Sequence, residues 1–175
     1  MPLGREKFRT TLRMDLEKEL SKGRNNRKAN KKLASHLLRK KPKGLDEVAH
    51  ELHDEAFEHI DCLDCGNCCK TTSPGMHDKD IERLAKHFRI KPAELIEKHM
   101  ELDREGEYVF RSAPCPFLGE DNKCSVYESR PLACREYPHT NRKRFYQVAE
   151  ISVRNTTICP AVVRILDGLR QVYLK

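Results

Sequence analysis

The sequence predicts a mainly helical α+β fold, in which a basic helical extension precedes a small cysteine-rich module with a few short strands. Three observations lead to this prediction. Apolar residues recur with a helical period through most of the chain, β-prone stretches are short and follow residue 107, and all eight cysteines follow residue 61. We place the extension at residues 1–44 and the cysteine-rich domain at residues 45–175.

Basic residues are concentrated in the extension. Residues 1–44 contain 15 Lys and Arg against 4 Asp and Glu, a net charge of +11, whereas the remaining 131 residues carry a net charge of −4. The chain has no apolar run long enough to span a membrane and no charged-then-apolar leader. We therefore expect a soluble, cytoplasmic protein without a membrane partner.

The extension is expected to form two helices. Residues 6–20 carry an apolar side chain at every fourth position, which predicts a helix that ends in a break at residues 21–23. A second, very basic helix is expected at residues 25–41, because Pro42 and Gly44 give the signals that end a helix. The apolar patch of this second helix consists of Leu33, Ala34, Leu37 and Leu38.

Two hypotheses account for this extension. It could be an electrostatic surface for nucleic acid or for another acidic partner, such as a protein. It could instead be a helical hairpin with a solvated basic face, packed on the rest of the chain through its leucines. Aromatic residues are nearly absent from it, and no known nucleic-acid motif is present. These observations favour the packed hairpin.

Three helices are expected between the extension and the first β-prone stretch. They cover residues 45–60, residues 78–88 with Asp78 as N-cap, and residues 92–100 with Pro92 in the first turn. The first carries His50 and His53, which lie three positions apart rather than the four of a zinc-protease helix. We therefore interpret these histidines as part of a solvated polar face.

The pattern changes after residue 107. Short strands are expected at residues 108–110 and 123–127, on either side of a turn at residues 119–122. One or two helical turns follow within residues 128–135, then a strand at residues 145–151. A closing helix begins at Pro160, and the preceding Cys159 lies where a helix dipole favours a thiolate.

The densest chemical signal is the stretch from Cys62 to Cys69. Its C-x2-C-x2-C spacing lets thiolates converge on one ion around a tight turn, and Gly66 suits such a turn because it adopts a positive φ without strain. Bacterial ferredoxins use the same run on one iron–sulfur cluster. We expect the adjacent Cys68 and Cys69 to face different partners. Four more cysteines follow at Cys115, Cys124, Cys134 and Cys159.

Eight cysteines also allow four disulfides. Disulfide scaffolds, however, are typical of short secreted chains with a leader, and adjacent cysteines rarely pair with each other. In a reducing cytosol the thiols stay available as ligands, so metal or cluster ligation is the favoured interpretation.

The joint order of these motifs resembles the CxxCxxCC cysteine-cluster family, also called YkgJ-like, which is described as zinc- or iron-chelating. The resemblance covers about residues 58–160 and leaves the extension outside. It rests on Cys62-x2-Cys65-x2-Cys68-Cys69, Cys115-Pro-Phe-Leu118, Cys124-Ser-Val-Tyr127, Arg130-Pro131 and Cys134-Arg135-x-Tyr137-Pro138. A relative with this domain, a flagellin lysine N-methylase, is associated with an iron–sulfur centre, and this resemblance favours iron. No nucleotide-binding glycine motif supports methyl transfer here.

We predict that all eight cysteines are metal ligands. The favoured main centre consists of Cys62, Cys65, Cys68 and Cys134. A second site or a supporting role remains for Cys69, Cys115, Cys124 and Cys159. An iron–sulfur cluster is preferred over Zn²⁺, although thiolates suit both. Three residues are expected to support the centre by offsetting its charge and donating hydrogen bonds, namely Tyr127, Arg130 and Arg135.

Three classes of function stay open at this point. An iron–sulfur centre could transfer electrons or activate a substrate, as in an oxidoreductase or a group-transfer enzyme. A structural zinc module could stabilise a small core while the extension binds a partner. A chelator could store or deliver metal. No Ser/His/Asp or paired-carboxylate arrangement supports hydrolysis, and whether the protein is an enzyme is left open.

Overall fold

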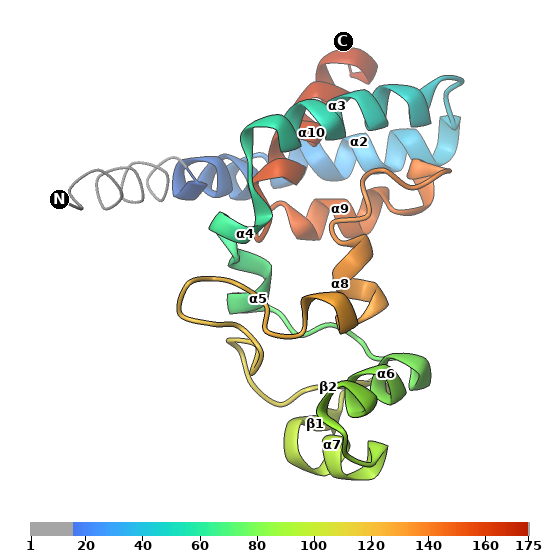
Figure 1. Ribbon diagram of the computed structural model, residues 1–175. Helices are drawn as coiled ribbons and strands as arrows, with labels where there is room; N and C mark the ends of the chain where they lie inside the picture. Colours follow the sequence, from blue (N-terminus) through green and yellow to red (C-terminus); the bar gives the residue numbers. More distant parts are fainter. Residues whose placement is uncertain (1–15, 175) are drawn as a thin grey trace, which may run out of the picture. The chain divides into compact units, whose positions relative to one another are not determined.

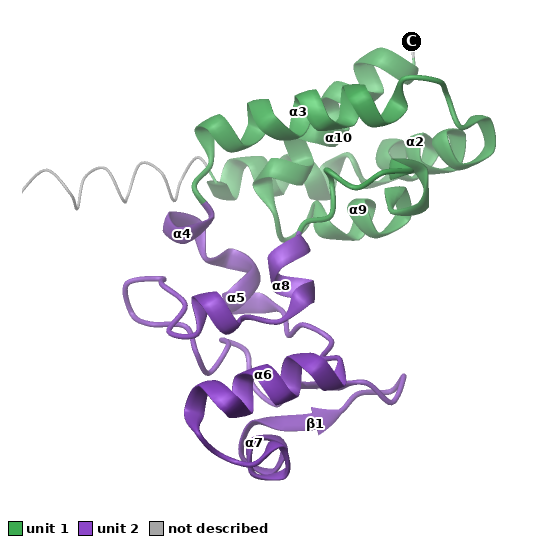
Figure 2. Ribbon diagram, turned by 45° about the vertical axis from the view of Figure 1, so that its right-hand side comes forward, with its two compact units in different colours: residues 1–61, 138–175 green, residues 62–137 purple. Residues whose placement is uncertain are grey.

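The computed structural model describes residues 16–174, which fold as two compact units (Figure 2). Residues up to Asp61, together with those from Pro138 onward, form unit 1, and Cys62–Tyr137 form unit 2. The chain thus enters unit 2 after its first helices and returns to unit 1 at Pro138. No helix within residues 16–174 is both long and apolar enough to cross a lipid bilayer.

Helices dominate both units, and the only β-sheet among the described residues has two strands (Figure 1). A first helical stretch covers residues 16–25. The elements after it are α2 (Arg27–Lys40), α3 (Leu45–His59), α4 (Cys62–Cys65), α5 (Asn67–Thr71), α6 (Asp78–Phe88), α7 (Pro92–His99), β1 (Met100–Leu102), β2 (Tyr108–Phe110), η1 (Tyr127–Ser129), α8 (Leu132–Glu136), η2 (Phe145–Gln147), α9 (Ala149–Asn155) and α10 (Pro160–Tyr173). The mainly helical α+β class is confirmed.

Unit 1 is built around α10, the most apolar of its helices. One side of α10 packs on α3, and α2 packs on α9 and α10. Seven residues of α10 are buried, and Leu33 and Leu37 of α2 are at most 1% exposed beside them. The leucines of the basic second helix are therefore core residues of unit 1. Leu38, by contrast, is 50% exposed.

The predicted break at residues 21–23 is wrong, because the helix continues through residue 25 and turns at residue 26. The structure gives Gly23 a different role. A Cβ atom at this position would lie 2.3 Å from the Thr156 carbonyl oxygen and 2.8 Å from Val163 Cγ2. Glycine is therefore needed for close packing of helices. Of the helix predicted over residues 6–20, residues 16–20 are helical, and residues 6–15 lie outside the described residues.

A loop at residues 138–145 is held against α3 by side chains of that helix. The Asp46 carboxylate accepts the backbone N–H groups of Arg144 and Phe145, at 2.6 and 2.8 Å. His53 Nδ1 lies 2.7 Å from Thr140 Oγ1, so this histidine is part of a packed contact and the prediction of a solvated face is wrong for it. Burial lowers the pKa of His53, an effect that His50 reinforces and Asp54 opposes.

The predicted strand at residues 145–151 is also wrong. Phe145 begins a single 3-10 turn, and α9 follows directly. The buried residues of α9 are Ala149, Ser152, Val153 and Asn155, which recur with a helical rather than an alternating period. The apolar residues of this short stretch fit either period, and packing against α2 decides between them.

Unit 2 has a small core between α6, α7 and the hairpin of β1 and β2. The strands are antiparallel, with Met100 opposite Phe110 and Leu102 opposite Tyr108. The expected helix at residues 92–100 therefore ends at His99, and Met100 opens a strand. The buried apolar residues are Met76, Ile81, Leu84, Ala85, Leu95, Met100, Phe110, Phe117 and Val126.

Two further expectations for unit 2 need correction. Residues 123–127 contribute one isolated bridge, between Cys124 and Leu118, and then a 3-10 turn, rather than a strand. The N-cap of α6 is His77 rather than Asp78. The acidic residue that binds back to the cap is Asp80, which accepts the His77 backbone N–H at 3.2 Å.

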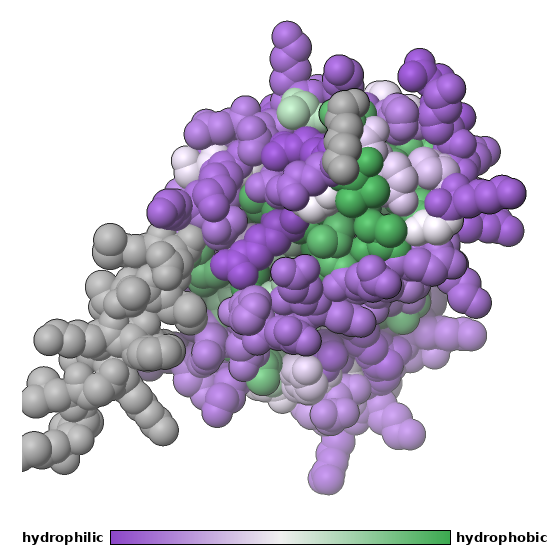
Figure 3. Space-filling view, turned by 90° about the horizontal axis from the view of Figure 1, so that it is seen from above, coloured by the Kyte–Doolittle hydropathy of each residue, from purple (hydrophilic) through white to green (hydrophobic). Residues whose placement is uncertain are grey.

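The surface of unit 1 is strongly polar. Seen from above, hydrophobic side chains gather mainly near the centre, and smaller hydrophobic patches lie within the hydrophilic surround (Figure 3). Long hydrophilic side chains project at the right-hand margin of this view, which corresponds to the end of unit 1 where α2 meets α3 in Figure 1.

Candidate metal centre

The cysteine-rich stretch forms two short helices joined by a tight turn. Gly66 lies between α4 and α5 with a φ of 54°, so the predicted positive φ at this residue is confirmed. The turn is closed by Gly66 N–H donating to the Cys62 carbonyl at 2.9 Å. The Asn122 side chain lies over Gly66 and donates to the Asp64 carbonyl at 3.0 Å. The stretch is thereby fixed to the 115–124 segment.

Backbone contacts bring three of the cysteines together. Cys115 N–H donates to the Cys69 carbonyl at 2.7 Å, which places the second cysteine group beside the first. A tight turn then brings Cys124 close to the segment that follows Cys115. Gly119 N–H donates to the Lys123 carbonyl at 2.8 Å, and Cys124 pairs with Leu118 in an isolated antiparallel β-bridge. Cys69, Cys115 and Cys124 thus lie in one region of unit 2.

We call Cys69, Cys115, Cys124 and Cys134 the inner thiols, because each lies within electrostatic range of the others. Burial, with a smaller contribution from the neighbouring thiols of this group, raises the pKa of Cys115 to about 11 and of Cys134 to about 12. The pKa of Cys69 is lowered to about 7, mainly by a hydrogen bond from Cys68 and also by Lys70. Bringing four thiolates so close disfavours their joint ionisation unless a cation is present.

Backbone N–H groups point at several of these sulfur atoms. The Sγ of Cys115 accepts from the N–H groups of Phe117 and Leu118, and the Sγ of Cys124 accepts from Val126 N–H. Cys65 accepts in the same way from Asn67 N–H. Each of these bonds lowers the thiol pKa, because it stabilises the anionic form. Hydrogen bonds to sulfur are a feature of thiolate metal and iron–sulfur sites.

Among the three predicted supporting residues, Arg130 acts electrostatically on two of the inner thiols, Cys124 and Cys134. Its positive charge acts against burial on the pKa of Cys124 and Cys134. The guanidinium stacks on the Tyr127 ring, 3.6 Å from the ring centroid. Arg135 instead donates to the backbone carbonyls of Arg130 and Glu128 at 3.0 and 3.5 Å. Arg135 therefore supports the segment that carries Arg130.

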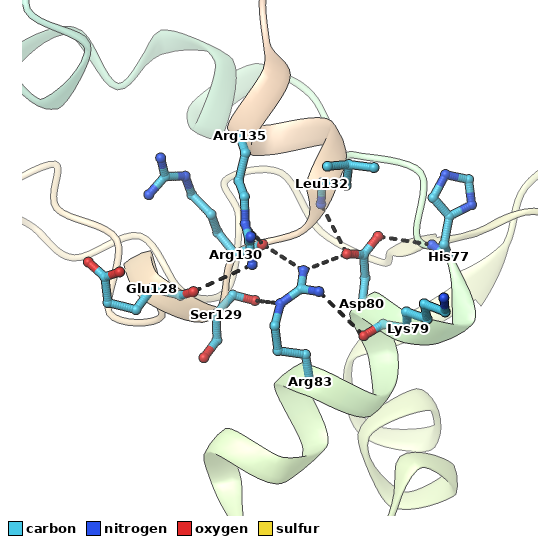
Figure 4. A network of polar contacts seen from close by, with 9 residues as sticks. All are labelled: His77, Lys79, Asp80, Arg83, Glu128, Ser129, Arg130, Leu132 and Arg135. Carbon is cyan, nitrogen blue, oxygen red and sulfur yellow. Dashed lines mark hydrogen bonds and ion pairs between the residues drawn. The ribbon is translucent and has the colours of Figure 1, made fainter.

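A polar network that the sequence did not predict holds this segment in place (Figure 4). Asp80, which is 2% exposed, accepts the Leu132 backbone N–H at 3.0 Å and pairs with Arg83. Arg83 in turn donates to the carbonyls of Ser129 and Arg130 at 3.2 and 2.8 Å. Burial opposes ionisation of Asp80, but these hydrogen bonds and the Arg83 charge outweigh it and lower its pKa.

The network positions Cys134, because Leu132 is the first residue of α8 and Cys134 is its third. The sequence signal for it was the Asp80–Arg83 pair, three positions apart at the start of a helix. That pattern is common in exposed ion pairs, and only the fold shows that it binds residues 129–132.

The remaining predicted ligands occupy different surroundings. Cys62 is exposed, and Cys65 and Cys68 are partly exposed on α4 and α5. Cys159 is buried in unit 1 at the N-cap of α10. No disulfide joins any two of the eight cysteines. With the side chains as they stand, no group of three or more His, Cys, Asp or Glu within residues 16–174 is closed around a metal position.

Comparison with known proteins extends these observations. The family profile CxxCxxCC, described as "Putative zinc- or iron-chelating domain", matches residues 61–158, more than half of the chain. An uncharacterized protein of Methanocaldococcus jannaschii is 30% identical over 86 residues, which are 47% of this chain and 46% of that protein. The chain thus spans about half the length of this relative. No solved structure matches the chain.

Proposed function

Since the chain belongs to the CxxCxxCC family of zinc- or iron-chelating domains, we propose that unit 2 ligates an iron–sulfur cluster through cysteine thiolates. We assign the main centre to the inner thiols, Cys69, Cys115, Cys124 and Cys134. The backbone of unit 2 carries this assignment: Cys115 N–H donates to the Cys69 carbonyl, Cys124 pairs with Leu118, and Asp80 binds the first residue of the helix that contains Cys134. Cys62, Cys65 and Cys68 are then candidate ligands of a second ion.

The donor set fits a soft or borderline metal. Thiolate sulfur selects zinc and iron–sulfur clusters over hard cations such as Mg²⁺ and Ca²⁺. Bound metal would replace the thiol protons, whose removal burial makes costly at Cys115 and Cys134. The backbone N–H groups of Phe117, Leu118 and Val126 would hold the sulfur atoms in orientation.

Arg130 has a separate role in this proposal. Four thiolates on a divalent or cluster centre leave a net negative charge, and a guanidinium held beside them offsets part of it. The Tyr127 ring and the Tyr127 carbonyl, which accepts from Arg130 Nη1 at 2.9 Å, fix the position of that charge. When bound, an iron–sulfur cluster would supply one-electron redox chemistry or a Lewis-acidic iron for a substrate.

Iron is preferred to zinc because Cys115, one of the inner thiols, precedes a proline, and ferredoxin cluster loops contain the same Cys-Pro step. The second candidate is a structural zinc module. It is favoured by the size of the unit 2 core, in which nine buried apolar residues stabilise a unit of 76 residues, Cys62–Tyr137. A metal would then supply folding free energy that this core lacks. Both candidates fit a reducing, cytoplasmic location.

The test is anaerobic purification followed by a visible spectrum and analysis of iron, zinc and acid-labile sulfide. A brown protein whose colour bleaches on reduction, with iron and sulfide in equal amounts, is the expected result. Colourless protein with stoichiometric zinc would replace the cluster by the structural module. Metal-free protein would contradict both.

Two matched variants test the ligand assignment. Cys124→Ser removes an inner thiol, whereas Cys65→Ser removes a thiol of the C-x2-C run. We expect Cys124→Ser to abolish the main chromophore and Cys65→Ser to remove at most the second ion. The reverse pattern would return the main centre to Cys62, Cys65, Cys68 and Cys134, the set that the sequence favours.

A further inference from the structure

We propose that unit 1 binds the phosphate backbone of double-stranded nucleic acid through a cationic surface made by two segments far apart in sequence. We call this surface the basic ridge. Its members are Arg39, Lys40, Lys41, Lys43, Lys143 and Arg144. All six side chains are exposed, four at the end of α2 and in the turn after it and two in the loop before η2.

Three contacts within unit 1 bring the two segments together. The Asp46 carboxylate, three positions after Lys43, accepts the backbone N–H groups of Arg144 and Phe145. The Lys41 Nζ lies over the Tyr146 ring, 5.1 Å from its centroid. His50 Nε2 lies 3.4 Å from the Arg142 carbonyl. The loop is thus held against the α2–α3 turn.

The backbone under the ridge is well defined. Lys41 caps α2 in the left-handed region with a φ of 44°, and its N–H donates to the Leu37 carbonyl at 2.9 Å. Gly44 and Arg144 also have positive φ, of 74° and 58°. The charges are therefore presented from a folded surface, which lowers the conformational entropy lost on binding.

Within residues 16–174, no ion pair offsets the charge of the ridge, because no carboxylate there pairs with any of its six members. Asp46 is engaged by two backbone N–H groups, and Glu47 is one exposed acidic residue on the same turn of α3. Four more exposed cations, Arg27, Lys28, Lys31 and Lys32, continue the surface along α2, which has no acidic residue.

The length of α2 suits binding to a polyanion. The 14 residues of α2 span about 21 Å at 1.5 Å per residue, which covers several phosphates of a duplex. The apolar stripe of α2 is buried in unit 1, so the helix has no such stripe left to insert into a lipid surface. The favoured partner is therefore nucleic acid, bound without sequence readout.

The test uses the full chain as purified. Fluorescence anisotropy with a labelled 20-base-pair DNA duplex of mixed sequence and an RNA duplex of the same sequence would measure affinity between 50 and 300 mM salt. We expect binding to at least one duplex, with a slope of log K against log salt of about −5 if six phosphates are contacted. A triple variant, Lys40→Gln, Lys41→Gln and Lys43→Gln, should reduce the slope to about −3 and weaken binding at least tenfold at low salt.

A matched variant separates the ridge from net charge. Lys79→Gln, Lys86→Gln and Lys98→Gln together remove the same charge from exposed positions of unit 2 and should change affinity less than twofold. Equal losses in the two triple variants, or no binding to either duplex, would overturn the proposal. So would binding to vesicles that contain phosphatidylserine in the absence of duplex binding. Thermal melts of both variants would exclude unfolding as the cause of a loss.

Discussion

The Asp80 carboxylate accepts the backbone N–H of Leu132 at 3.0 Å, across 52 residues of sequence. This bond, with the Asp80–Arg83 pair, connects α6 to the segment that carries Arg130 and Cys134. Asp80→Ala would leave Arg83 and the Leu132 N–H without this acceptor. We expect a loss of about 3 kcal/mol in the free energy of unfolding, measured by urea denaturation of the metal-free protein.

Glu82→Ala is the matched control for Asp80→Ala, because Glu82 is an exposed acidic residue on the same helix. Its cost should stay within about 0.5 kcal/mol. Asp80→Ala should also lower the amount of metal retained on dialysis, since Cys134 lies two positions after Leu132. Metal retention equal to that of Glu82→Ala would show that the network does not position the centre.

A Gly23→Ala substitution would test how closely the helices of unit 1 pack at this position. Gly23→Ala would place a Cβ 2.3 Å from the backbone oxygen of Thr156, which cannot move without shifting the end of α9. We expect a cost of about 2 kcal/mol despite the better helix propensity of alanine. At Gly168 the added Cβ would meet the Leu52 side chain, at 2.5 Å, and that side chain can rotate away. Gly168→Ala should therefore cost less than Gly23→Ala in the same thermal melt, and equal costs would contradict the packing argument.

Leu37 and Leu38 are adjacent residues of one type with opposite surroundings. Leu37 is fully buried between α2 and its neighbours in unit 1, whereas Leu38 is 50% exposed. We expect Leu37→Ala to destabilise the protein by about 3 kcal/mol and Leu38→Ala by less than 1 kcal/mol, as measured by urea denaturation. The division of the chain at residue 44 stays a prediction. Small costs for both variants would show that α2 contributes little to the stability of unit 1, as a separate extension requires.

The longer helices could be predicted because the helical pattern of apolar residues extends over many residues and because local sequence signals mark the helix ends. Pro92 and Pro160 open α7 and α10 as expected, and Gly44 ends the turn after α2. The helix break predicted at residues 21–23 was wrong because the sequence alone does not distinguish a glycine that ends a helix from a glycine that allows two helices to pack closely. The short stretches, such as residues 145–151, depend on packing partners that lie far away in the chain.

The ligand set stays a prediction, and the proposed grouping of the cysteines differs from the one that the sequence favoured. The spacing of cysteines along the sequence shows only which of them are close in the chain, so it favoured Cys62, Cys65 and Cys68 as ligands of one centre. The inner thiols Cys69 and Cys115 meet through a backbone hydrogen bond between residues 46 positions apart, which no local pattern contains. Asp80 was missed for the same reason, because its main partner is 52 residues away.

His53 should make the stability of unit 1 depend on pH. Burial holds its pKa below the ordinary value of 6.5, so the folded state favours the neutral ring. In the unfolded chain the pKa returns to that value and the ring binds a proton more readily. The contribution of His53 to stability is therefore fully present above about pH 6.5 and declines as the pH falls through the lower, folded pKa.

The measurement is urea denaturation of metal-free wild type and His53→Gln at intervals from pH 8 to pH 5. Glutamine can still hydrogen-bond Thr140, which His53 contacts at 2.7 Å, but it does not titrate. We expect the free energy of unfolding of His53→Gln to fall less steeply than that of wild type over this range. His36→Gln removes a histidine from α2 and controls for the substitution itself. Parallel curves for wild type and His53→Gln would show that this ring is not kept neutral by the fold.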